Sequence, residues 1–102
     1  MPNLITASEA KQMLDEQQGY VLLDVRTEQE YAEGHIPGAL LIPNTELSEK
    51  AADLLPDKEQ TILVYCRSGR RSAEAARTLA DMGYTQVYDF GGIIDWPYEI
   101  EK

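Results

Sequence analysis

Short apolar runs alternate along the chain with longer stretches in which apolar residues recur at helical spacing. Strands are predicted at residues 3–5, 20–25, 39–42, 61–65 and 86–90. The run "TILVY" at residues 61–65 is apolar and rich in β-branched side chains, which is typical of a strand buried on both faces. Because strands that alternate with helices form parallel sheets, the pattern predicts an α/β fold with a mostly parallel sheet and helices on both of its faces.

The helices are predicted from their start and stop signals as well as from their spacing. They are expected from Thr6 to Gly19, from Thr27 to Gly34, over residues 46–55 and over residues 72–82. In each of the first two, a threonine is followed three residues later by a glutamate, which is a capping-box pattern. The last helix has alanine and leucine on one face and ends at Gly83, a usual residue at a helix C-terminus.

The composition is that of a soluble globular protein, with 43% hydrophobic and 26% charged residues. At 102 residues the chain is expected to form one domain over its whole length. No apolar stretch approaches the roughly 20 residues of a membrane span. The N-terminal "MPNLITASEA" has neither the basic nor the apolar region of a signal peptide. We therefore expect a cytoplasmic protein, with a monomer as the simplest assembly.

The net charge of −9 limits the partners that the protein can have. A nucleic-acid backbone or an anionic membrane surface would repel such a chain, so nucleic-acid and membrane binding are not expected. With one cysteine and one histidine, the chain forms no internal disulfide and has too few ligands for a typical zinc site. No metal and no organic cofactor is expected.

The stretch "CRSGRRS" at residues 66–72 directly follows the predicted buried strand. It contains the only cysteine, Cys66, and the arginines Arg67, Arg70 and Arg71, within a chain that is otherwise acidic. Ligands of parallel sheets bind at the carboxyl ends of the strands, and this stretch begins at such an end. Its position predicts a functional role for Cys66.

The residues around Cys66 are of types that stabilise a thiolate. A cysteine thiol has a pKa of about 8.5, and a shift of about two units, which makes the thiolate dominant at neutral pH, needs about 2.7 kcal/mol. The N-terminus of the following helix contributes roughly 0.3–1 kcal/mol, or up to about 2 kcal/mol when partly buried. An arginine that turns inward adds to this, and Gly69 permits a tight turn whose amides face the sulfur.

The same groups would hold an anionic substrate beside the nucleophile, because amides and guanidinium groups both bind oxyanions. In the plainer interpretation, Cys66 is a small residue of the hydrophobic core. The polar residues that follow it, and its place at the end of a strand, favour the functional interpretation. Since the chain has no second thiol, a group carried on Cys66 must pass to another molecule.

Three segments match the motifs of one known family in the right order. The first is "DVRTEQEYAEGHIPGALLIP" at residues 24–43, similar to the pattern D-x-R, then E followed by an aromatic residue, then G-H-I-x-G-A and I-P. The second is "CRSGRRS", and the third is "GGIIDW" at residues 91–96, similar to G-G-x-x-x-W. Leu41 departs from the pattern, since many relatives have Asn or His there. Together the segments resemble the single-domain rhodaneses, which are sulfurtransferases.

The resemblance implies a five-stranded parallel sheet flanked by helices, and it implies a mechanism. Cys66 would attack the outer sulfur of a small-molecule donor such as thiosulfate and become a persulfide. That sulfur would then pass to a thiophilic acceptor, which is cyanide in an assay and a thiol or a partner protein in the cell. The residues implied to bind the donor are Arg67, Ser68, Gly69, Arg70, Arg71 and Ser72. Among the arginines we favour Arg70 and Arg71.

Other residues are expected to support the site rather than to act in it. Asp24 and Arg26 lie at the end of a predicted strand, and we expect them to form an ion pair that shapes the loop. His35 lies on a loop ahead of a strand, and the resemblance implies a structural role for it rather than a cysteine–histidine dyad. Trp96 and Tyr98 are expected to pack in the core or to line a pocket.

Other functions stay open at this point. A cysteine-dependent phosphatase or arsenate reductase shares the thiolate and the arginine, but such phosphatases need a C-x5-R loop. Here Ser72 occupies that position and Arg71 closes a shorter C-x4-R, which we expect to be too small for a phosphoryl group. The remaining alternatives are a non-catalytic interaction module on the same fold, and a persulfide carrier with little thiosulfate turnover.

Overall fold

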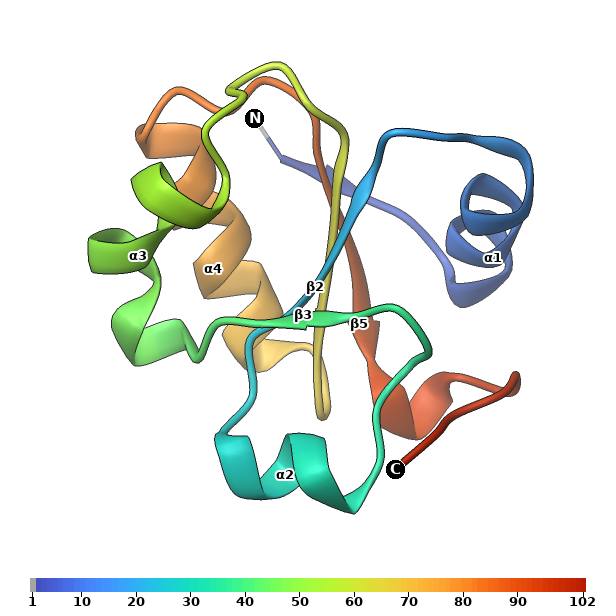
Figure 1. The fold of residues 1–102 in the computed structure, drawn as a ribbon. Helices are drawn as coiled ribbons and strands as arrows, with labels where there is room; N and C mark the ends of the chain where they lie inside the picture. The colour runs from blue at the N-terminus through green and yellow to red at the C-terminus, as the bar shows by residue number, and fades with distance from the viewer. Residues whose placement is uncertain (1) are drawn as a thin grey trace.

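Five parallel strands form one sheet in the computed structural model, which describes residues 2–102 (Figure 1). The strands are β1 (Asn3–Leu4), β2 (Val21–Asp24), β3 (Leu40–Leu41), β4 (Ile62–Cys66) and β5 (Val87–Gly92). Their order across the sheet is β1-β5-β4-β2-β3, and every neighbouring pair is parallel. The predicted α/β fold is confirmed, and β4 lies at the centre of the sheet.

Helices cover both faces of this sheet and its carboxyl edge. They are α1 (Ala7–Glu16), α2 (Glu28–Glu33), α3 (Leu47–Leu54) and α4 (Arg70–Asp81), with short 3-10 turns at Asn44–Glu46 and Ile93–Asp95. In Figure 1, α3 and α4 lie on one side of the sheet and α1 on the other, while α2 lies near the carboxyl ends of the strands. Within residues 2–102, no helix combines the length and the apolar character needed to cross a membrane.

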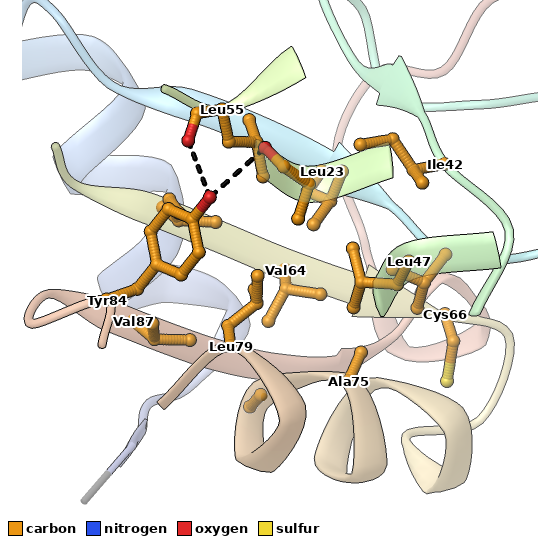
Figure 2. Packing of buried hydrophobic residues seen from close by; sticks show 14 residues of the cluster. Leu23, Ile42, Leu47, Leu55, Val64, Cys66, Ala75, Leu79, Tyr84 and Val87 are labelled. Atoms are coloured by element: carbon orange, nitrogen blue, oxygen red, sulfur yellow. Dashed lines mark hydrogen bonds between the residues drawn. The ribbon is translucent and has the colours of Figure 1, made fainter. Parts of the chain in front are cut away.

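Two hydrophobic clusters, one on each face, form the core. Because side chains alternate along a strand, Leu63 and Tyr65 of β4 face the cluster that contains Ala10 of α1. Val64 and Cys66 face the other cluster, against α3 and α4. Figure 2 shows Cys66 at one end of this second cluster, with its sulfur near the start of α4. The alternation of β4 thus directs the thiol toward the N-terminus of a helix.

The start signals in the sequence predict the first two helices correctly. The Thr6 hydroxyl accepts a hydrogen bond from the Glu9 amide at 3.1 Å, and Glu9 Oε1 accepts one from the Thr6 amide at 2.9 Å. Thr27 and Glu30 form the same reciprocal pair at the start of α2. Both capping boxes are therefore confirmed.

Several predicted boundaries are wrong by a few residues. The helix expected at residues 72–82 begins earlier, at Arg70, because Gly69 takes a φ of +103° and turns the chain directly into the helix. The helix expected at residues 46–55 is preceded by a 3-10 turn after Pro43. The last strand continues to Gly92, since it pairs with β4 as far as Cys66. The earlier start of α4 and the longer β5 both place regular structure next to Cys66.

Candidate active site

Cys66 is the last residue of β4, the strand in which every residue is buried. Its side chain is fully buried, and its sulfur accepts a hydrogen bond from the backbone N–H of Gly69 at 3.0 Å. The chain therefore folds back over the sulfur within three residues. This contact places a backbone donor on the atom that would carry negative charge in a thiolate.

The N-terminus of α4 adds a favourable electrostatic field at the same place. Gly69 is the residue that precedes the helix, and its left-handed conformation costs little because glycine has no Cβ. The amides in the first turn of a helix have no acceptor within the helix, so they favour an anion placed before it. Cys66 lies directly ahead of this twelve-residue helix.

Gly92 supports the loop from behind. Its partner in the sheet is Cys66, and a Cβ on Gly92 would lie 2.1 Å from the carbonyl oxygen of Arg67 and 2.5 Å from the Cα of Ser68. The Arg67 carbonyl also accepts a hydrogen bond from the Ile94 amide at 3.2 Å. The second glycine of "GGIIDW" is thus required because the backbone of the cysteine loop lies against it.

Ser72 is fully buried at the back of the loop. Its hydroxyl donates to Asp89 Oδ1 at 2.7 Å and lies 3.1 Å from the Gly69 carbonyl oxygen. Asp89 Oδ1 also accepts from the Gly91 amide at 2.9 Å. The resemblance implies a substrate-binding role for Ser72, but here its hydroxyl ties the loop to the neighbouring strand.

The three arginines of the loop have different surroundings. The side chains of Arg67 and Arg70 are exposed. Arg71 instead donates from Nη1 to Glu30 Oε1 at 2.7 Å and from Nη2 to Glu30 Oε2 at 2.9 Å. This bidentate pair joins the first turn of α4 to α2. The hydrogen bond from Arg71 is the main cause that lowers the pKa of Glu30 to about 2.

A second ion pair lies buried beneath the site, as expected for Asp24 and Arg26. Arg26 donates from Nε to Asp24 Oδ1 at 3.0 Å and from Nη2 to Asp24 Oδ2 at 2.8 Å. It also donates to the Gly34 carbonyl at 2.6 Å. The hydroxyl of Tyr65 donates to Asp24 Oδ2 at 2.7 Å and accepts from the Ile36 amide at 3.1 Å. Burial, followed by the charge of Asp24, raises the pKa of this tyrosine.

A groove of about 300 Å³ adjoins the loop. Its walls are formed by Arg26, Glu30, Glu33, Gly34, Arg67, Ile93, Ile94 and Ile100. Arg67 follows Cys66 directly, so the groove gives a reactant an approach to the face of the loop that carries this exposed arginine.

Comparison with known proteins identifies the family. The model of the rhodanese-like domain matches residues 6–97. The chain belongs to the rhodanese family. It is 44% identical over 73 residues to the thiosulfate sulfurtransferase PspE of Escherichia coli (strain K12), a match that covers 72% of this chain and 70% of that protein. It is 36% identical to a sulfurtransferase of Allochromatium vinosum, over 94% of this chain and 89% of the relative.

Solved rhodanese structures have the same fold. A rhodanese with anions from E. coli is 40% identical with a TM-score of 0.76, and the match covers 81% of this chain and 98% of that one. The human single-domain sulfurtransferase TSTD1 is 28% identical with a TM-score of 0.81, over 94% of this chain and 95% of that one. The resemblance drawn from the three sequence segments is confirmed, and so is the sulfurtransferase class that it implied.

In this rhodanese, His35 packs against its own segment of the chain. Its ring stacks on Tyr31, with ring centroids 3.8 Å apart, and Nδ1 lies 2.9 Å from the Tyr31 carbonyl oxygen. Its backbone forms a two-way bridge with Glu101, and Nε2 lies 3.4 Å from a carboxylate oxygen of the same residue. These contacts account for both ring nitrogens. Trp96 is buried against Phe90, as expected of a core residue.

Three polar contacts at or beneath the cysteine loop are not predicted by the sequence. They involve Glu30, Tyr65 and Asp89. Asp89 left a signal, because a carboxylate in the middle of the apolar strand "VYDF" needs a buried partner. Glu30 was already assigned to a capping box, and its second partner lies 41 residues further along the chain. Sequence spacing alone does not indicate such a pair.

Proposed function

We propose that this rhodanese transfers sulfane sulfur from an anionic donor such as thiosulfate to a thiophilic acceptor by way of a persulfide on Cys66. The observation that carries the proposal is the 3.0 Å hydrogen bond from the Gly69 amide to the sulfur, at the N-terminus of α4. A backbone donor and a helix N-terminus at one sulfur favour its anionic form, which is the nucleophile.

The first half-reaction forms a sulfur–sulfur bond on the enzyme. The Cys66 thiolate attacks the outer sulfur of thiosulfate, the S–S bond of the donor breaks, and sulfite leaves with the electron pair. The persulfide anion that results replaces the thiolate next to the loop amides. Arg67 and Arg70, whose side chains are exposed beside the loop, attract the donor and contact its oxyanion.

The second half-reaction returns the enzyme to its starting state. A nucleophilic acceptor attacks the outer sulfur of the persulfide, and the Cys66 thiolate leaves. With cyanide the product is thiocyanate, and with a thiol it is a new persulfide. Because the enzyme is modified between the two steps, ping-pong kinetics are expected. Both steps use only the thiol, so the proposed reaction includes no metal and no organic cofactor.

The cellular acceptor, the domain organisation, the assembly state and the location of the enzyme stay predictions from the sequence. We propose a thiol or a partner protein as the acceptor in the cell, one catalytic domain over residues 1–102, and a monomeric, cytoplasmic enzyme. The net charge of −9 supports a protein acceptor with a basic surface.

The proposal is tested by intact-mass measurement of the purified protein before and after exposure to thiosulfate. We expect a gain of one sulfur atom that cyanide removes as thiocyanate, and no gain in Cys66→Ser, whose fold is checked by circular dichroism. A gain of sulfur by both wild type and Cys66→Ser would show that Cys66 is not the residue that carries the sulfur. Loading from a persulfide-donating protein but not from thiosulfate would identify a persulfide carrier instead.

Phosphatase chemistry is not expected of this loop. In a C-x5-R loop the arginine holds the phosphoryl oxygens, whereas Arg71 closes a shorter loop and its guanidinium is engaged by Glu30. We therefore predict no turnover of an aryl phosphate. Turnover by the wild type that is lost in Cys66→Ser would contradict this prediction.

A further inference from the structure

The positive charge of the loop is smaller than its three arginines suggest. Arg71 directs both terminal nitrogens of its guanidinium group at the two carboxylate oxygens of Glu30, at 2.7 and 2.9 Å. A bidentate pair of this kind is directional and is fixed more firmly than a single contact. Among residues 2–102, neither Arg67 nor Arg70 forms an ion pair, so the uncompensated charges beside Cys66 belong to these two exposed arginines.

Glu30 is held in place independently of Arg71. Its Oε1 also accepts from the Thr27 amide at 3.1 Å and from the Thr27 hydroxyl at 3.2 Å, within the capping box of α2. The side chains in the pair retain 35% exposure for Arg71 and 22% for Glu30, so solvent reaches the edge of the pair. The hydrogen bond from Arg71 lowers the pKa of Glu30 to about 2, so the carboxylate is ionised at neutral pH.

The Arg71–Glu30 pair lies next to the cysteine loop. Arg71 belongs to the first turn of α4, between Gly69, whose amide donates to the sulfur, and the buried Ser72. The hydrogen bond to Glu30 is the largest cause that raises the pKa of Arg71, and a negatively charged sulfur on Cys66 would raise it further. Glu30 also lines the groove that contains Arg67. A donor at the loop would therefore experience the charges of both Arg71 and Glu30.

We propose that Glu30 is a specificity-determining residue that neutralises Arg71 and so lowers the preference of the site for a dianionic donor over donors of lower charge. The inference rests on the proposed sulfur transfer through Cys66. By compensating one of the three loop arginines, Glu30 leaves the site usable by thiosulfate and by monoanionic donors such as thiosulfonates and persulfides.

The test compares two donors that load the same sulfur but differ by one charge. Thiosulfate, a dianion, releases sulfite, whereas methanethiosulfonate, a monoanion, releases methanesulfinate. In ping-pong kinetics, kcat/KM for the donor reports the donor half-reaction alone, measured here as thiocyanate formed with cyanide as acceptor. Glu30→Gln keeps the size of the side chain and its capping bonds but removes its charge. The values of kcat/KM for both donors are compared in wild type and variant.

We expect Glu30→Gln to raise kcat/KM for thiosulfate about fivefold, mainly through KM, and that for methanethiosulfonate about twofold. The gain should shrink at high salt, where exposed charges are screened. A loss of structural support would not depend on donor charge or on salt in this way. Glu33→Gln is the matched control, because Glu33 lies on the same helix and in the same groove but Arg71 pairs with Glu30. Glu33→Gln should give a clearly smaller gain in kcat/KM for thiosulfate than Glu30→Gln.

A double-mutant cycle separates the field of Arg71 from a direct contact. Arg71→Gln leaves Glu30 uncompensated and should lower kcat/KM for thiosulfate, whereas Arg71→Gln combined with Glu30→Gln restores neutrality and should return it to near the wild-type value. The proposal is overturned if the double variant is as poor as Arg71→Gln alone, which would mean that the donor contacts Arg71. It is also overturned if Glu30→Gln lowers kcat/KM for thiosulfate.

The failure of this inference and the failure of sulfur transfer itself give different results. If wild-type protein gains sulfur from thiosulfate and Cys66→Ser does not, the proposed function stands whatever the Glu30 variants do. If wild type never carries sulfur, the reaction on which the role of Glu30 rests is wrong, and the inference falls with it.

Discussion

Two bidentate arginine–carboxylate pairs flank the cysteine loop, and they differ chiefly in burial. Arg26 and Asp24 are 6% and 0% exposed, whereas Arg71 and Glu30 are 35% and 22% exposed. Their shortest contacts are nearly equal, at 2.8 and 2.7 Å. Geometry alone therefore does not distinguish them, and the surrounding medium determines what each pair does.

The buried pair is a structural element. Both side chains have further partners, which are the Tyr65 hydroxyl for Asp24 and the Gly34 carbonyl for Arg26, so the desolvation cost of the charges is offset only when all partners are present. The exposed pair contributes little to stability, because water screens it. In our proposal, the charges of Arg71 and Glu30 nevertheless act on a donor at the loop. The buried Asp24–Arg26 pair thus supports stability, and in our proposal the exposed Glu30–Arg71 pair affects donor specificity.

Removal of one partner of the buried pair should have the largest effect on stability. Arg26→Met keeps much of the side-chain volume but leaves the Asp24 charge buried without its partner. We expect the free energy of unfolding to fall by about 3–5 kcal/mol. Urea denaturation followed by circular dichroism measures this loss. Arg26→Lys, which keeps the charge but not the fork, should lose less, and equal losses would show that the charge itself is not what matters.

A steric change behind the loop should come next and should affect activity most. In Gly92→Ala the new Cβ would meet the Arg67 carbonyl at 2.1 Å, so the loop backbone must shift. We expect roughly 1–3 kcal/mol of destabilisation and about a 10- to 100-fold loss of kcat/KM in thiocyanate formation.

Gly38→Ala is the control for that experiment. Gly38 has a φ of +87° but nothing within 4 Å of an added Cβ, so alanine there strains the backbone without moving the loop. It should cost about 1–2 kcal/mol of stability and leave kcat/KM near that of wild type. A similar loss of activity in both variants would mean that Gly92 has no special relation to the loop.

The smallest effect concerns the exposed pair and depends on pH. The pKa of Glu30 is lowered from 4.5 to about 2 in the folded protein, so its stabilising contribution is fully present above about pH 4.5 and is lost as the pH falls toward 2. Since the pair is partly solvated, we expect the free energy of unfolding of wild type to exceed that of Glu30→Gln by about 1 kcal/mol or less at pH 7. Thermal unfolding at pH 7, 4 and 2.5 should show this difference shrinking. A constant difference would assign it to something other than this ionisation.

The fold class, the strand that carries Cys66 and the two capping boxes can all be predicted from the amino-acid sequence. These features depend on residues close together in the chain: alternating apolar runs, threonine and glutamate three apart, and a cysteine directly after a buried strand. Asp24 and Arg26 are only two residues apart, and their ion pair was expected for the same reason. Contacts between residues so close in the chain can be predicted from the sequence.

Contacts between distant segments establish which arginine of the loop is compensated and why Gly92 and Asp89 are needed. Glu30 meets Arg71 across 41 residues, and Asp89 meets Ser72 across 17, because parallel strands bring their carboxyl ends to one edge. The three arginines look equivalent in "CRSGRRS". The direction in which each arginine side chain leaves the loop or the first turn of α4, and which residues it contacts there, is a property of the folded molecule. Contacts between distant segments exist only after the sheet has formed, so no local pattern predicts them.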